Sequence, residues 1–262
     1  MVFGLLRGWK RRRLLERSFP PHWEPFVTRW LPFVASLEPE EGERFRAHLK
    51  LFVWEKHWVG AMGLEVTEEM QVVIAGLAAR LSRNLPFEVF ERLGEVVLYS
   101  REFLNPADEL GLPTHGEAHH FGTVVLSWES VLDGLAYPCE GYNPALHEFA
   151  HVLDYTSGYF DGTPILHDGK DYEPWARILS TYFESLRQNP EESFLDVYGA
   201  EDEAEFFAVA TEAFFELPDI MAVEAPELFD VLKSYYRLDP ILVPCQCEDH
   251  DEDHEEERDQ SR

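Results

Sequence analysis

Apolar residues recur at helical spacing along the first part of the chain. The clearest stripe follows Thr67, a residue type that often begins helices, and it consists of Met70, Val73, Ile74, Leu77 and Leu81. A second amphipathic pattern covers residues 40–58. We predict helices at 40–58 and 67–83, with both apolar stripes buried in a core.

The pattern then changes from helical spacing to short β-branched runs. Two such runs, at 94–100 and 122–128, are typical of strands. Helical spacing returns beyond them and predicts helices at 143–157, at 174–188, from residue 204 onward and at 225–237. This order predicts an α+β fold, in which helices pack against a small sheet.

Two histidines four residues apart, His147 and His151, stand in the predicted helix at 143–157. Four residues make about one helical turn, so both imidazoles can reach one metal ion. Glu148 is placed to take a proton from a metal-bound water, as in zinc peptidases. Because Asn143 and a following proline predict a helix start, and the neighbouring residues are apolar, we favour a metal site over two structural core histidines.

A catalytic zinc usually has three protein ligands and one open position. The extended motif with a third histidine is excluded, because Asp154 and Ser157 occupy the positions where it needs glycine and histidine. Glu205 and Glu212 lie two turns apart on one face of the apolar helix predicted from residue 204. Carboxylates there are seldom unpaired, so one can bind the metal and the other can support it. The spacing does not decide which.

Seven short motifs occur in an order that is typical of one family: GEVVLYS, GLPTH, VVLSW, HEFAH-xx-D, VYGA, AEFFAV and EAFFELPD. From about residue 37 to residue 240 the chain resembles the Mlc titration factor A family of zinc peptidases. Its latter part is also similar to the catalytic domain of anthrax lethal factor. The resemblance implies a zincin-like, gluzincin-type peptidase fold and one Zn²⁺ per chain, bound by His147, His151 and Glu205.

The same resemblance implies roles for the residues around the zinc. Glu148 is expected as general base, Tyr198 as the donor that stabilises the oxyanion, and Glu212 as a residue that supports a ligand. In related folds the strand before the zinc helix aligns the substrate, and the matching segment here is 122–128. Asp154, one turn beyond the second histidine, either orients a ligand imidazole or is a surface carboxylate.

A histidine before that strand is expected as a fourth zinc ligand. The best match is His115 in the GLPTH motif, and His119 and His120 are alternatives because this stretch holds one extra residue. The glycine- and proline-containing loop around His115 favours movement. We therefore expect His115 to replace water at the zinc in the resting enzyme and to inhibit it.

Composition predicts the remaining organisation of the chain. We expect a basic segment at 1–17, one peptidase domain at 18–244 with a helical part at 18–92 and a catalytic part at 93–244, and a disordered acidic tail at 245–262. The basic segment is interpreted as a frayed terminus rather than a membrane-contacting helix. A formal net charge of −28 and the lack of a long apolar run argue against direct nucleic-acid binding and a transmembrane segment.

Three cysteines in 262 residues argue against a disulfide scaffold and for a reducing, cytoplasmic location. Cys139 is expected as a small buried residue. A second metal site can be drawn from Cys245, Cys247, His250 and His254 in the tail, but a solvated acidic tail is the better interpretation.

The function favoured by these observations is zinc-dependent hydrolysis of a peptide or protein substrate. Aminopeptidase activity is one form of it, although the sequence does not determine where the substrate is cut. The alternative is a regulatory protein that sequesters a transcriptional repressor, with peptidase activity secondary or self-inhibited. A structural protein with a closed four-ligand zinc site is a third possibility.

Overall fold

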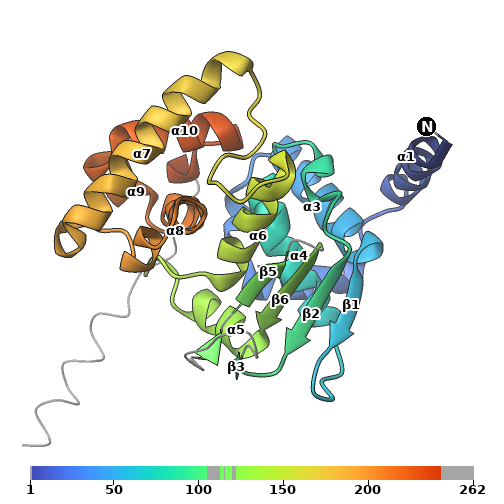
Figure 1. Ribbon diagram of the computed structural model, residues 1–262. Helices are drawn as coiled ribbons and strands as arrows, with labels where there is room; N and C mark the ends of the chain where they lie inside the picture. The colour runs from blue at the N-terminus through green and yellow to red at the C-terminus, as the bar shows by residue number, and fades with distance from the viewer. Residues whose placement is uncertain (1, 105–112, 115, 120–121, 243–262) are drawn as a thin grey trace, which may run out of the picture.

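The computed structural model describes residues 2–104, 113–114, 116–119 and 122–242. Its helices are α1 (Val2–Leu15), α2 (Glu24–Trp30), α3 (Pro39–Glu55), α4 (Glu68–Ser82), α5 (Trp128–Ala136), α6 (Pro144–Asp154), α7 (Tyr172–Gln188), α8 (Glu203–Glu216), α9 (Pro218–Glu224) and α10 (Pro226–Tyr236). Its strands are β1 (His57–Gly60), β2 (Glu95–Tyr99), β3 (Phe103–Leu104), β4 (Pro113–Thr114), β5 (Gly116–His119) and β6 (Thr123–Ser127). The α+β prediction is confirmed (Figure 1).

Local sequence signals explain where the predicted helices begin and end. Thr67 caps α4, since its hydroxyl accepts a hydrogen bond from the Met70 amide at 3.2 Å. The predicted helix at 40–58 is too long at its C-terminal end. The chain turns extended at Lys56 and continues into β1, because pairing with β2 holds these residues in a strand.

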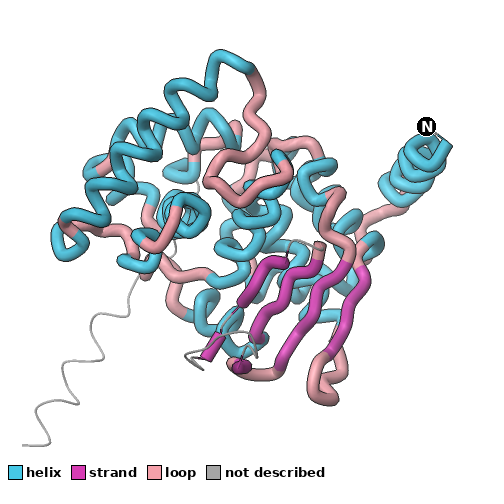
Figure 2. The backbone as a smooth tube through the Cα atoms, in the orientation of Figure 1, coloured by secondary structure: helices cyan, strands magenta, loops and turns pink. Residues whose placement is uncertain are grey.

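The main sheet has the strand order β1-β2-β6-β5 (Figure 2). The first three strands are parallel, whereas β5 is antiparallel to β6. The predicted strands at 94–100 and 122–128 are confirmed as β2 and β6. The expectation that 122–128 aligns substrate by edge pairing is wrong, because β6 is paired on both sides. Within the described part of the chain, the free edge beside α6 belongs to β5.

Aromatic side chains fix α6 in the core. Phe149, in the middle of α6, has its ring centroid 5.4 Å from that of Phe52 and 5.8 Å from that of Phe90. All three rings are fully buried. Their edge-to-face contacts connect α6 to α3 and to the segment that precedes β2, which leaves the opposite side of α6 to face α8.

The N-terminal end of the described chain differs from the prediction. The basic N-terminal segment is not frayed: it forms α1, and Leu14 is buried. The Arg11 guanidinium binds the Glu55 carboxylate at 2.8 Å and that of Glu88 at 3.0 Å, which fixes the helix to the body. The predicted tail site with its cysteines and histidines lies outside the described residues.

Two further findings concern the class of protein. None of the helices in the described ranges has the length and apolarity needed to cross a membrane. Cys139 is half-buried and disulfide-bonded, so the prediction of a buried, reduced cysteine is wrong. Its backbone has a positive φ of 71°, in the turn between α5 and α6.

Candidate metal centre

The helix that carries the two histidines begins at Asn143. Its side-chain oxygen accepts a hydrogen bond from the Leu146 amide at 3.1 Å, and Pro144 occupies the first helical position. The helix ends at Asp154, and one turn of 3₁₀ helix then leads to Gly158, which has a φ of 101°. This left-handed conformation is accessible to glycine at little cost, so the local sequence fixes both ends of the histidine helix.

Helix α8 lies beside α6 and supplies the carboxylates (Figure 1). Asp202 caps its N-terminus, since its carboxylate accepts hydrogen bonds at 2.9 Å from the Ala204 and Glu205 amides. From Phe206 to Glu216 every residue of α8 is buried. Glu212 and Glu216 therefore lie in a core, whereas Glu205, nearer the start of the helix, is partly buried.

The structure brings His147, His151 and Glu205 together. The Nε2 atoms of the two histidines are 3.2 Å apart. Glu205 Oε2 lies 2.9 Å from Nε2 of His147 and 3.4 Å from Nε2 of His151. Within the described ranges, these three residues form the cluster whose ligand atoms, all within 4.8 Å of one another, could hold a metal ion.

Glu212 faces the other side of the first histidine. Its Oε1 accepts a hydrogen bond from Nδ1 of His147 at 2.8 Å, and its Oε2 accepts one from the Asn143 amide at 2.6 Å. With a proton on Nδ1, the lone pair of a neutral His147 lies on Nε2, which points at Glu205. The spacing left the two glutamates equivalent, but the structure gives them different positions.

The histidines and glutamates of the cluster shift one another's pKa values. Burial alone would lower the pKa of His147, but its hydrogen bonds to Glu205 and Glu212 outweigh burial and place the pKa well above its usual value. Burial likewise would raise the pKa of Glu205, yet hydrogen bonds from His147 and His151 lower it to about 2. The cluster therefore pairs an anionic Glu205 carboxylate with a protonated His147 imidazole, and a metal cation bound here would take the place of that proton.

The donor set fits a zinc ion. Two imidazole Nε2 atoms face each other at 3.2 Å and compete for one carboxylate oxygen, an arrangement that gives each lone pair a partner when a cation lies among them. Two nitrogens and one carboxylate oxygen are a typical ligand set of catalytic zinc and leave a fourth position for water. Glu212 then fixes the tautomer of His147 from behind.

Glu148 and Tyr198 are both close to this cluster. Glu148 is buried on α6 directly after the first histidine, and its charge acts on both His147 and Tyr198. The ring centroid of Tyr198 lies 5.8 Å from that of His147. Burial and neighbouring carboxylates, Glu205 first among them, raise the pKa of Tyr198. The phenol therefore stays protonated at neutral pH and is available as a hydrogen-bond donor.

Asp154 is fully buried, so the alternative of a surface carboxylate is wrong. Its Oδ2 accepts a hydrogen bond from the Gly162 amide at 3.0 Å, which ties the loop after α6 to the helix end. Burial is the main reason that the pKa of Asp154 rises to about 6. Among the described residues, neither Oδ1 of Asp154 nor Nδ1 of His151 has a hydrogen-bond partner, so an orienting role for this carboxylate stays a prediction.

Some predicted residues cannot be placed, and some contacts were not predicted. His115 and His120 lie outside the described residues, and the side chain of His119 is not described. The sequence reasoning missed Glu216 and Arg80, which extend the network behind Glu212. Glu216 could have been found by the argument used for the other glutamates of α8, because it too is an acidic residue in an apolar helix.

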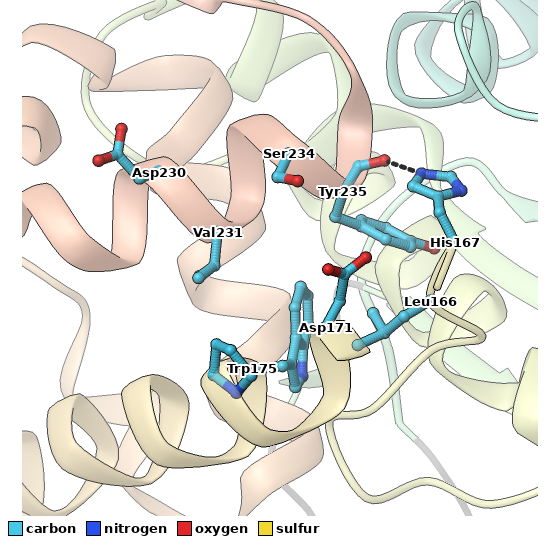
Figure 3. Close-up of a pocket in the computed structure, with 9 residues that line it drawn as sticks. Leu166, His167, Asp171, Trp175, Asp230, Val231, Ser234 and Tyr235 are labelled. Atoms are coloured by element: carbon cyan, nitrogen blue, oxygen red, sulfur yellow. Dashed lines mark hydrogen bonds between the residues drawn. The ribbon is translucent and has the colours of Figure 1, made fainter. Parts of the chain in front are cut away.

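The hollow drawn in Figure 3 is a separate feature. It has a volume of about 200 Å³ and lies between α7, α10 and the loop before α7. His167 donates a hydrogen bond from Nε2 to the Tyr235 carbonyl at 2.7 Å along one side of it. None of the residues of the metal cluster lines this hollow, so the hollow and the metal cluster are separate sites.

Comparison with known proteins gives the class first. A family model described as glucose-regulated metallo-peptidase M90 matches residues 6–237. The chain belongs to this family of metallopeptidases, which agrees with a metal cluster built on two helices.

Individual relatives extend the comparison. An uncharacterised protein of Synechocystis is 32% identical over 89% of this chain and 90% of its own length. Proteins named Mlc titration factor A are also similar. The one from Pectobacterium atrosepticum is 28% identical over 84% of this chain and 87% of its own, and the one from Escherichia fergusonii is 28% identical over 89% and 92%. The resemblance drawn from the sequence motifs is therefore confirmed.

Proposed function

We propose that this protein is a zinc-dependent peptidase, with His147, His151 and Glu205 as the zinc ligands. The observation that carries the proposal is the convergence of two imidazole Nε2 atoms on one carboxylate oxygen, with ligand atoms within 4.8 Å of one another. Membership of a metallopeptidase family supports the choice of reaction. Zinc is the metal that this nitrogen and oxygen donor set favours.

The residues around the cluster divide the chemistry among them. Zinc would supply a Lewis acid that lowers the pKa of a water ligand to about 7 and polarises the substrate carbonyl. Glu148 accepts the proton of the attacking water and passes it to the leaving amine. Tyr198, kept protonated by its raised pKa, donates a hydrogen bond to the oxygen on which negative charge develops. The free edge of β5 beside α6 suits main-chain pairing with an extended peptide.

The test is peptide hydrolysis by the zinc-loaded protein and its Glu148→Gln variant. The amide cannot accept a proton, so the variant should keep the metal and lose nearly all activity against a mixture of peptides. Tyr198→Phe should lower kcat more than it raises KM, because an oxyanion donor acts mainly in the transition state. Equal turnover in Glu148→Gln and wild type would assign the hydrolysis to a contaminant and refute the proposal.

A second candidate function comes from the names of the relatives. Several similar proteins are called Mlc titration factor A, which favours binding of a transcriptional repressor as an alternative or added function. A pull-down of a repressor by the zinc-free protein would separate sequestration from hydrolysis. A cytoplasmic location is part of this proposal, because a transcriptional repressor acts there. The disulfide bond of Cys139 is unusual for that compartment. Self-inhibition by His115 stays a prediction, since this residue lies outside the described ranges.

A further inference from the structure

Polar contacts form a continuous chain from α4 to the back of the metal cluster. Arg80 Nη1 lies 2.6 Å from Glu216 Oε1. The same oxygen accepts a hydrogen bond at 3.3 Å from the side-chain amide of Asn143. The backbone amide of Asn143 donates to Glu212 at 2.6 Å, and Glu212 accepts from His147 Nδ1 at 2.8 Å. Three helices that lie apart in sequence thus meet at the residue that begins the histidine helix.

We propose that Arg80 and Glu216 are positioning residues, which set the orientation of His147 through Asn143. This inference deepens the proposed function and rests on it. Neither residue reaches the metal ligands, so neither is catalytic. Their effect is on where α6 begins relative to α8, and hence on the direction in which the first imidazole points.

Asn143 is the residue through which the effect passes, because all of its polar groups are used. Its amide and side-chain nitrogen bind Glu212 and Glu216, which are one turn apart on α8. Its side-chain oxygen accepts from Leu146, and its carbonyl accepts from the amide of His147 at 3.0 Å. Movement of Asn143 therefore moves the backbone of His147 and its Glu212 contact together.

Arg80 is required because the carboxylate that it binds is deeply buried. The side chain of Glu216 is 3% exposed, and a buried carboxylate left without a cation is strongly destabilising. Arg80 is itself held at a second point, since its Nη2 donates to the Phe215 carbonyl at 2.8 Å. Its guanidinium carbon lies 4.9 Å above the centre of the Phe33 ring. The pair is thus fixed in place, not merely close.

The rival explanation is that Arg80 and Glu216 form a structural ion pair with no influence on the metal. Buried ion pairs are weak evidence for stability and are often replaceable by apolar residues. Zinc affinity of the folded protein separates the two explanations, because a purely structural pair changes the unfolding temperature and leaves that affinity alone. Residues that support metal ligands through hydrogen bonds typically change metal affinity by about 10- to 100-fold.

A small hollow provides an additional test. A cavity of about 70 Å³ is lined by side chains that include Arg80, Asn143 and Glu216. Truncation of Arg80 enlarges this cavity and leaves the buried carboxylate at its wall. Free guanidinium ion can then occupy the space of the missing side-chain head and pair with Glu216. Rescue by a small cation is a response that lost stability alone does not produce.

The experiment measures the zinc dissociation constant of Arg80→Ala by competition with a chelator, below the unfolding temperature of the metal-free variant. We expect zinc affinity to fall about tenfold and to recover when guanidinium chloride is added at non-denaturing concentration, but not with tetramethylammonium chloride at the same ionic strength. The matched control is Arg11→Ala on α1, which removes a largely buried guanidinium that lies 2.8 Å from Glu55. It should lose stability and keep wild-type zinc affinity.

A double variant guards against a folding failure. Arg80→Met with Glu216→Leu removes both charges of the pair, so no buried charge is left alone, and it also removes the contact to Asn143. We expect a folded protein with zinc affinity reduced to the same extent as in Arg80→Ala. Wild-type affinity in both variants would overturn the positioning role, whereas a wild-type protein that binds no zinc would overturn the proposed function itself.

Discussion

His147 is the residue on which the metal centre depends most. Its two ring nitrogens face two different glutamates, Glu205 at Nε2 and Glu212 at Nδ1. The sequence could predict that both carboxylates need partners, because they stand in an apolar helix. It could not predict which nitrogen each would meet, because that depends on how α6 and α8 rotate against each other. The structure supplies this rotation.

The two glutamates should therefore respond differently to substitution. Glu205→Ala removes a ligand and should abolish stable zinc binding. Glu212→Ala removes only the acceptor behind His147 and should weaken binding about 10- to 100-fold while a full equivalent of zinc still binds at high concentration. Zinc titrations of both metal-free variants, compared with wild type, give the answer. Loss of zinc in Glu212→Ala with retention in Glu205→Ala would exchange the two roles.

At the scale of elements, periodicity and capping residues predicted the long helices well. α4 begins after Thr67 and α6 after Asn143, because both side chains accept a backbone hydrogen bond that a helix start leaves unused. The helical pattern of the sequence runs on into β1, since its four residues have no strand pattern of their own and depend on β2 as a partner. The sequence favours a frayed N-terminus over a helix, because the ion pairs that fix α1 join residues far apart in sequence.

The start of β6 gives a prediction at the same scale. Gly122 has a φ of 78°, and a Cβ atom there would overlap the Arg92 carbonyl. Its own carbonyl accepts hydrogen bonds from Gly94 and Glu95 that begin β2. Gly122→Ala should therefore lower the free energy of unfolding by about 3 kcal/mol or more, as measured by urea denaturation.

The matched control for this substitution is Gly63→Ala. Gly63 has a similar φ of 85°, but no atom lies within 4 Å of its added Cβ. Its substitution carries only the conformational cost, which is about 1 kcal/mol. Equal losses in the two variants would show that the contact with Arg92 has no effect.

At the scale of the whole molecule, the stability of the fold depends on pH. The net charge is −28, and one histidine that is shielded from water adds a pH dependence of its own. Burial, followed by the nearby Arg44, lowers the pKa of His48 to about 4 from the usual 6.5. The unfolded chain binds a proton at this residue below pH 6.5, whereas the folded chain does so only near pH 4. Stability from this residue is therefore present above pH 6.5 and is lost as the pH falls towards 4.

His48→Gln should flatten this part of the pH dependence. The glutamine does not titrate, so the loss of unfolding free energy between about pH 7 and about pH 5 should be smaller than in wild type by roughly 2 kcal/mol. Urea denaturation of the metal-free proteins measures the difference. A His48→Gln curve that follows the wild-type curve would contradict this assignment.

Zinc stoichiometry of the wild-type protein and of His147→Ala tests the central claim most directly. If His147, His151 and Glu205 form the metal centre, the wild type binds one zinc per chain, because these three ligands make one site. His147→Ala then binds none at the same free zinc concentration while its helices remain folded by circular dichroism. A full equivalent of zinc in His147→Ala, at wild-type affinity, would contradict the account.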